Sequence, residues 1–206
     1  MTGSIWQRLA AFFWPAPIAG AEAFRTFLEE RAWLIAQKCA IDYCRGKTGL
    51  ASYALFTEKP FLEALDICHR ESFAAVLGDL LLIAEGQLRD HVSPERRDKL
   101  REALQHFYTQ TLATLPLPAH RPQGWSDSVA EFGQRLRAAS EGSPRKALDV
   151  ADHSAKRMFD TLPIHLSMRE LDEEPVYGSV RFRMIAVSQE MQNRLVAAEL
   201  VGQLIA

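Results

Sequence analysis

Apolar residues recur at helical spacing in nearly every segment of this chain, whereas the alternation typical of strands is rare. Leu100, Leu104 and Phe107 follow the i, i+4, i+7 spacing of one buried helix face, and the same spacing recurs over residues 184–205. The one clearly alternating stretch, residues 180–184, fits a helix once the frame is extended on both sides. The pattern therefore predicts an all-α, bundle-like array of about six to eight helices.

Start and stop signals divide the chain into segments. The most continuously apolar stretch carries Leu77, Leu80, Leu81, Leu82 and Ile83, and it predicts a central helix that is buried on all sides. Ser93-Pro94 and Ser143-Pro144 each predict a helix start, because a hydroxyl suits the N-cap and a proline suits the first helical position. Close glycines at 46 and 49 predict a helix end. The expected helices cover residues 4–14, 21–43, 61–91 as one kinked helix, 94–115, 126–140, 143–162 and the segment from Pro175 to the C-terminus, the last as one long helix.

The N-terminal segment combines one cation with a long apolar run. The run follows Arg8 and ends in Ala19-Gly20-Ala21, which resembles a secretory cleavage site. The single arginine and the interruptions at Pro15 and Pro17 argue against a signal peptide. No run reaches the roughly 20 apolar residues that span a bilayer. We therefore expect a chain that is soluble, or at most peripheral to a membrane.

Size, charge and cysteine content narrow the class of protein. The chain has 206 residues and a formal net charge of -2, which gives no basic footprint and argues against a nucleic-acid partner. Cys39, Cys44 and Cys68 are too few, and odd in number, for a disulfide framework. They are typical of reduced, buried thiols in a cytoplasmic protein. We interpret residues 1–206 as a single cytoplasmic domain, with residues 1–20 as an N-terminal arm.

A Gly-Lys-Thr sequence at residues 46–48 is the one fragment of a nucleotide-binding motif. A phosphate-binding loop needs another glycine five positions earlier and a strand before it, but that position is Ile41, within a predicted helix. We therefore exclude nucleotide hydrolysis by this motif. Two interpretations of the turn remain, a solvated connection between helices and a weak anion site made by cations and backbone amides.

Metal and catalytic signatures are incomplete. The chain lacks the Glu-x-x-His pairs of helical di-metal proteins. Cys39 and Cys44 diverge by about 140° around a helix, and the adjacent Cys68 and His69 diverge by about 100°, so these four side chains do not converge on one ion. A Gly-x-Ser-x-Gly nucleophile elbow is also lacking. The sequence favours a non-catalytic protein and predicts neither a metal nor a cofactor.

The two ends of the chain carry the leading functional hypothesis. An aromatic segment near the N-terminus contains Trp6, Phe12, Phe13 and Trp14. Three interpretations are open: the segment packs on the protein's own core, binds in a groove of a partner protein, or lies in a membrane interface. Membrane contact is not favoured, because the segment has only one basic residue. Residues 197–206 are apolar to the terminus and pack in the core or against a second copy. We predict an adaptor, assembly factor or regulatory protein that acts through protein contacts, with self-association through the C-terminal helix as a further option.

The alternative hypothesis is a helical protein that binds a small molecule, an enzyme included, in a pocket between helices. Its polar lining is predicted to be Tyr43, Arg45, Lys47 and His69, which come from the segments that flank the central apolar helix. The convergence of these four side chains is assumed in this hypothesis.

Overall fold

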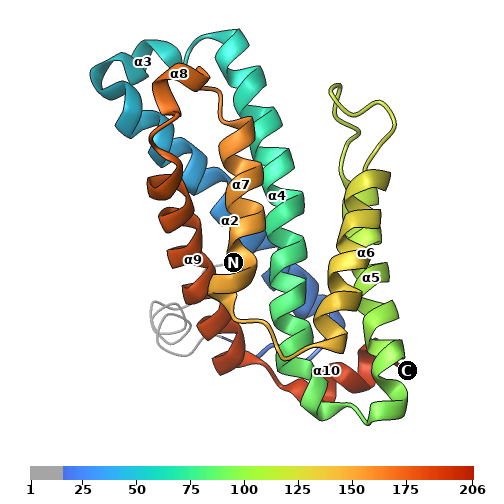
Figure 1. The fold of residues 1–206 in the computed structure, drawn as a ribbon. Helices are drawn as coiled ribbons and strands as arrows, with labels where there is room; N and C mark the ends of the chain where they lie inside the picture. The colour runs from blue at the N-terminus through green and yellow to red at the C-terminus, as the bar shows by residue number, and fades with distance from the viewer. Residues whose placement is uncertain (1–15) are drawn as a thin grey trace, which may run out of the picture.

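The computed structural model describes residues 16–206, which form an all-α array, as the sequence predicts (Figure 1). The aromatic positions Trp6, Phe12, Phe13 and Trp14 lie outside the described residues. Among residues 16–206, no helix is both long and apolar enough to cross a membrane.

The central element is α4, a continuous helix of 30 residues from Lys59 to Leu88. Nearly all of its second half is buried, so the predicted central apolar helix is confirmed. In the described part of the chain, seven helices have eight or more residues, within the range predicted. The helices packed around α4 are α2 (Ala21–Thr48), α5 (Arg97–Thr114), α6 (Ser126–Glu141), α7 (Ala147–Thr161), α9 (Glu173–Arg194) and α10 (Ala197–Leu204).

Short helical turns connect these elements. In Figure 1, α2, α4, α7 and α9 form a long bundle, and the α5–α6 hairpin packs along one side of α4. The turns α3 and α8 lie at one end of the bundle, whereas α10 crosses the opposite end. The connecting turns are η1 (Gly49–Ala51), α3 (Ser52–Leu55), η2 (Arg89–His91), η3 (Pro94–Arg96) and α8 (Leu166–Arg169).

Two predicted helix boundaries are wrong, and each has a local reason. α2 continues through Gly46 to Thr48, because only Gly49, with a φ of 53°, takes the left-handed conformation that ends the helix. α7 starts at Ala147 rather than at Ser143-Pro144. The chain before α7 crosses α4, with Pro144 against Gly86, so these residues serve as a packed connection instead of a helix start.

The prediction of one unbroken C-terminal helix is also wrong. The helix stops at Arg194, because the backbone of Leu195 pairs with that of Ile18. The Ile18 amide donates to the Arg194 carbonyl at 2.8 Å, and the Val196 amide donates to the Ile18 carbonyl at 3.0 Å. Ile18 itself is buried, so the part of the N-terminal arm that the structure describes is fixed to the bundle.

Candidate functional site

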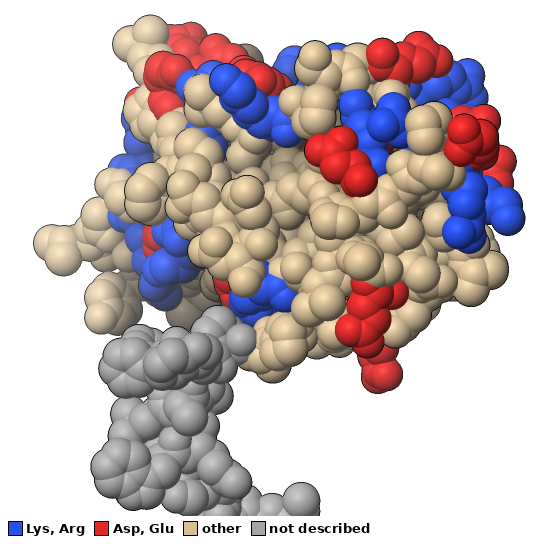
Figure 2. Space-filling model, turned by 90° about the horizontal axis from the view of Figure 1, so that it is seen from below, with Lys and Arg blue, Asp and Glu red and all other residues tan. Residues whose placement is uncertain are grey.

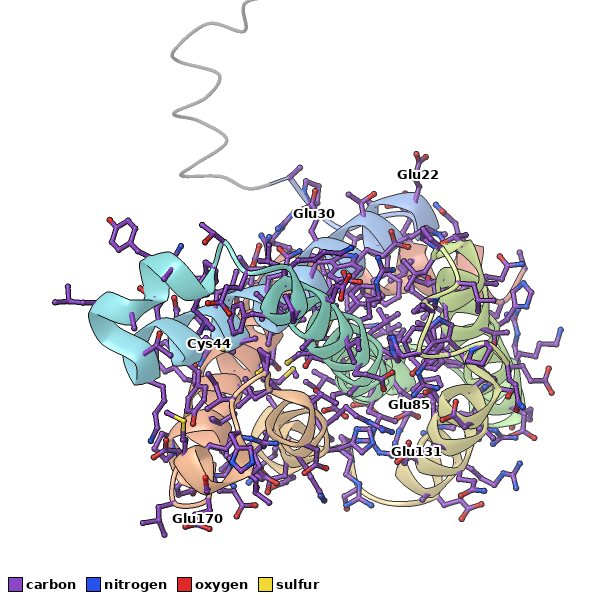
Figure 3. The ribbon with its side chains drawn as sticks, turned by 90° about the horizontal axis from the view of Figure 1, so that it is seen from above. Glu22, Glu30, Cys44, Glu85, Glu131 and Glu170 are labelled. Atoms are coloured by element: carbon purple, nitrogen blue, oxygen red, sulfur yellow. The ribbon has the colours of Figure 1, made fainter. Side chains whose placement is uncertain are left out.

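Three carboxylates are buried within the apolar half of α4. Glu71, Asp79 and Glu85 are 6%, 0% and 4% exposed, and Figure 3 shows Glu85 inside the helical array. A charged group in such a place needs ionic and hydrogen-bonding partners, because transfer out of water is costly. The three carboxylates and their partners form what we call the polar cluster, between α4, α6 and α7. It is the densest group of buried, ionisable side chains in the described part of the chain.

Glu71 is bound by side chains from the loop before α6. Arg121 donates from Nε to Oε1 and from Nη2 to Oε2, the latter at 2.8 Å, and His120 Nε2 lies 2.9 Å from Oε1. Arg157 of α7 adds a further guanidinium, with Nη1 3.8 Å from Glu71 Oε2. Burial alone would raise the pKa of Glu71, but the hydrogen bonds and charges of these groups outweigh it and lower the pKa below its usual value of 4.5.

This arrangement gives a prediction for acid stability. A carboxylate whose folded pKa is lowered stabilises the fold above its unfolded pKa of 4.5, and this contribution is lost as the pH falls through the folded value. Glu71→Gln should therefore cost about 2 kcal/mol at neutral pH, and less below pH 4.5. Urea unfolding across this range measures the difference. Glu63→Gln, at an exposed position of the same helix, should show neither effect; equal pH slopes for both variants would contradict the assignment.

Asp79 anchors the second half of the cluster. Arg135 of α6 donates from Nη2 to Asp79 Oδ1 at 2.5 Å, and the backbone amide of Ser154 donates to Oδ2 at 3.1 Å. Arg135 also donates from Nη1 to His153 Nδ1 at 2.8 Å. A guanidinium has no acceptor, so Nδ1 carries no proton, and His153 Nε2 donates its proton to Glu131 at 2.9 Å. Figure 3 shows Glu131 on α6, and its bond to His153 joins α6 to α7.

The polar cluster encloses a cavity that is too small for a substrate. Its volume is about 10 Å³, close to the space for one water molecule. Among residues 16–206, no group of three or more His, Cys, Asp or Glu side chains is placed to hold a metal ion. With its charges paired to one another, the arrangement acts chemically as an ionic clamp that holds α6 on α4 and α7.

The cysteines do not add a reactive group. All three are buried and free, which confirms their predicted burial. Burial raises the pKa of Cys44 to about 12 and that of Cys68 to about 11, and it also raises the pKa of Cys39. Because the thiolate is the nucleophilic form, these residues are inert at neutral pH.

The four side chains predicted to line a pocket are only partly brought together. Tyr43 and Lys47 both donate to Asp172 Oδ2, at 2.9 Å and 2.6 Å. Arg45 instead lies over the ring of Phe56, with its guanidinium carbon 5.4 Å from the ring centroid. His69 is half-buried on α4, and its Nε2 has no hydrogen-bond partner among the described residues. None of the four lines the cavity of the polar cluster.

A second candidate surface is the end of the bundle around α10, which we call the α10 end (residues 16–20 and 192–206). Seen from below in Figure 2, the centre of this face is largely free of charged side chains. The buried side chains of Leu200, Val201 and Ile205 hold α10 on the core. The exposed positions of this end include the uncharged residues Gln192, Asn193, Val196, Ala198, Gly202 and Gln203, together with Glu199.

Sequence reasoning missed the polar cluster, although a signal was present. Glu71, Asp79 and Glu85 interrupt a segment that was predicted to be buried on all sides, so each had to find a partner. The partners of Glu71 and Asp79 lie on other elements and could not be identified from spacing, whereas Arg89 lies four positions after Glu85, a spacing that indicates an ion pair on one helix face.

Comparison with known proteins adds no assignment. The chain matches no family model, and it has no significant match among curated proteins or solved structures.

Proposed function

We propose that this chain is a non-catalytic adaptor, assembly factor or regulatory protein that binds a different protein through its α10 end. The observation that carries the proposal is the pairing of Ile18 with Leu195, which fixes the chain just after the aromatic segment beside α10. The two apolar ends of the sequence therefore border one face with few charged side chains, and Trp6, Phe12, Phe13 and Trp14 supply the aromatic anchors.

The chemistry of this end suits a protein better than a membrane. Interface cores are depleted in charged residues and enriched in aromatic ones, and tryptophan is prominent among binding hot spots. Helices that lie on membranes usually carry a basic face, whereas residues 1–15 contain only Arg8 as a charged side chain. The unbridged, buried cysteines suit a reducing compartment, so we place this activity in the cytoplasm.

Photo-crosslinking tests the proposal directly. The full chain, with a benzophenone amino acid at position 12, is expressed in its own host and irradiated. The expected result is one dominant adduct with a different protein, identified by mass spectrometry and then purified for binding measurements. An adduct confined to this chain would show that Phe12 packs on its own core, and an adduct between two copies would show self-association. Either result would overturn the proposal.

Two glycines provide a matched pair of variants. Gly202 on α10 and Gly178 on α9 are both exposed and helical, and a Cβ added at either meets no atom within 4 Å. Gly202→Arg places a charge on the α10 end and should weaken binding of the purified partner about tenfold or more. Gly178→Arg should leave the affinity unchanged. Equal affinities for the two variants would exclude α10 from the interface.

A further inference from the structure

The end of the bundle opposite α10 carries the most exposed apolar side chains of the structure. We call it the α3–α8 end (residues 45–59 and 165–174), and Figure 3, drawn from above, looks onto it. Leu50, Tyr53 and Leu171 are 94%, 87% and 91% exposed, more than any other large apolar residue in the described part of the chain. Exposed apolar residues gathered on one surface mark a place where another molecule binds.

The exposure of α8 follows from the way this short helix is held. Arg169 is buried and donates from its Nη atoms to the carbonyls of Phe159 and Asp160 near the end of α7. Because Arg169 fixes one side of α8 on the core, Leu166 and Met168 lie on the outer side, where both are exposed. The apolar outer side of α8 is therefore a fixed feature of the fold.

One ion pair joins the two sides of this end into a single surface. Lys47, close to the end of α2, donates to Asp172 Oδ2 at 2.6 Å. Leu50 follows Lys47 by three positions, and Leu171 directly precedes Asp172. The exposed apolar side chains of the α3 side and of the α8 side therefore border the same ion pair.

The two sides of the surface carry opposite charge. Residues 45–59 hold three cations and one carboxylate, whereas residues 165–174 hold four carboxylates and one arginine, so the α3 side is basic and the α8 side is acidic. In the described part of the chain, Arg45, Glu170 and Glu173 form no ion pair. Charges of both signs are thus left for a second molecule.

We propose that the α3–α8 end is the interface of a two-fold homodimer. A two-fold axis through this surface sets the basic α3 side of one copy against the acidic α8 side of the other, so the chain is complementary to itself. The five exposed apolar side chains offer on the order of 800 Å² together, about the share of one partner in a standard interface. A membrane is a poorer occupant, because anionic lipids repel the acidic side.

The dimer goes beyond the proposed function and does not depend on it. The α10 ends lie at the opposite end of each bundle, so they stay uncovered in the dimer. Two copies joined in this way present two α10 ends, and each can bind its own partner molecule. A partner that is itself multivalent would be held more tightly by the dimer than by one copy.

Sedimentation velocity of the full chain over a range of concentrations tests the proposal. The unchanged chain should sediment as a dimer at about 50 μM. Leu171→Glu should weaken dimerisation about a hundredfold or more, because the symmetry places the new charge at two positions of the apolar interface. Phe182→Glu is the control, at the next most exposed apolar position, on α9, and should leave the dimer unchanged.

Exchange of charges tests the two-fold arrangement itself. Arg45→Glu should weaken dimerisation about tenfold, because two acidic sides then meet. Adding Glu170→Arg to the same chain should recover most of this loss, since the charges of the two sides are then exchanged. Circular dichroism and thermal unfolding check that each variant is folded.

Four results would overturn the proposal. They are a monomeric unchanged chain at about 50 μM, equal dissociation of Leu171→Glu and Phe182→Glu, no recovery in Arg45→Glu/Glu170→Arg, and a dimer that Gly202→Arg breaks but Leu171→Glu does not. The last result would place self-association at the α10 end. A monomer that binds phosphatidylcholine vesicles, and loses this binding in Leu171→Glu, would assign the surface to a membrane instead.

Discussion

Arg89→Met should lower the free energy of unfolding by about 3–5 kcal/mol at neutral pH, because it removes one partner of a buried ion pair. Arg89 and Glu85 are 5% and 4% exposed. Arg89 donates from Nε and Nη2 to the two carboxylate oxygens of Glu85, at 3.0 Å and 2.6 Å. Without the guanidinium, Glu85 remains as a buried and unpaired charge. Urea unfolding with linear extrapolation measures the loss.

Arg89 has a second role, so a compensating change at Glu85 does not restore all of the lost stability. It donates to the carbonyls of Ala139 and Gly142, at 2.7 Å and 2.5 Å, where α6 ends. Helix ends leave their last carbonyls without intrahelical partners, so Arg89 caps α6 from the end of α4. The double variant Glu85→Leu/Arg89→Met removes the unpaired charge and should recover only part of the stability, because the carbonyls of Ala139 and Gly142 still lack the hydrogen bonds that Arg89 donates.

An exposed pair of the same spacing provides the control. Lys156 and Asp160 lie four positions apart on α7 with their charged atoms 2.8 Å apart, and both side chains are mostly exposed. Lys156→Met should cost at most about 1 kcal/mol, since solvent screens such pairs. If Arg89→Met costs no more than Lys156→Met, the burial of the pair contributes nothing and the capping role is wrong.

Local patterns predicted the helices well where local forces decide them. The predicted segment 126–140 matches α6, and Tyr43 and Lys47, one turn apart, do share a helix face and reach the same carboxylate. The failures arise from distant contacts. The break at Leu195 depends on a backbone pairing with Ile18, far away in the sequence, and the late start of α7 depends on the crossing at Gly86.

The ion pairs of the candidate site likewise depend on contacts between distant parts of the sequence. Periodicity indicates that Asp79 lies on a buried face, but it does not indicate that Arg135, 56 positions later, will pair with it. The pairing arises only when the α5–α6 hairpin folds back on α4. The exposed character of Gly202 likewise follows from the packing of α10, whose apolar side is used to close the core.

Arg135→Met should lower the free energy of unfolding by about 3 kcal/mol at neutral pH, because Asp79 then loses the one guanidinium partner it has among residues 16–206. Asp79 is fully buried, and the remaining donor to it is the Ser154 amide. Arg135 is partly exposed, so we expect a value at the low end for a broken buried pair. Arg137→Met, two positions along on the exposed side of α6, should change stability by about 0.5 kcal/mol or less.

The pH dependence of this variant distinguishes an uncompensated charge from a simple loss of packing. Burial raises the pKa of Asp79 even in the unchanged chain, where the Arg135 guanidinium opposes the shift. Without Arg135 the pKa rises further, and a folded pKa above the unfolded one means that the folded state gains protons as the pH falls. The deficit of Arg135→Met should therefore shrink toward acidic pH, and Asp79→Asn/Arg135→Met should lack this recovery. A deficit that does not change with pH would show that Arg135 acts by filling space, and α6 would then be held on α4 by apolar contacts alone.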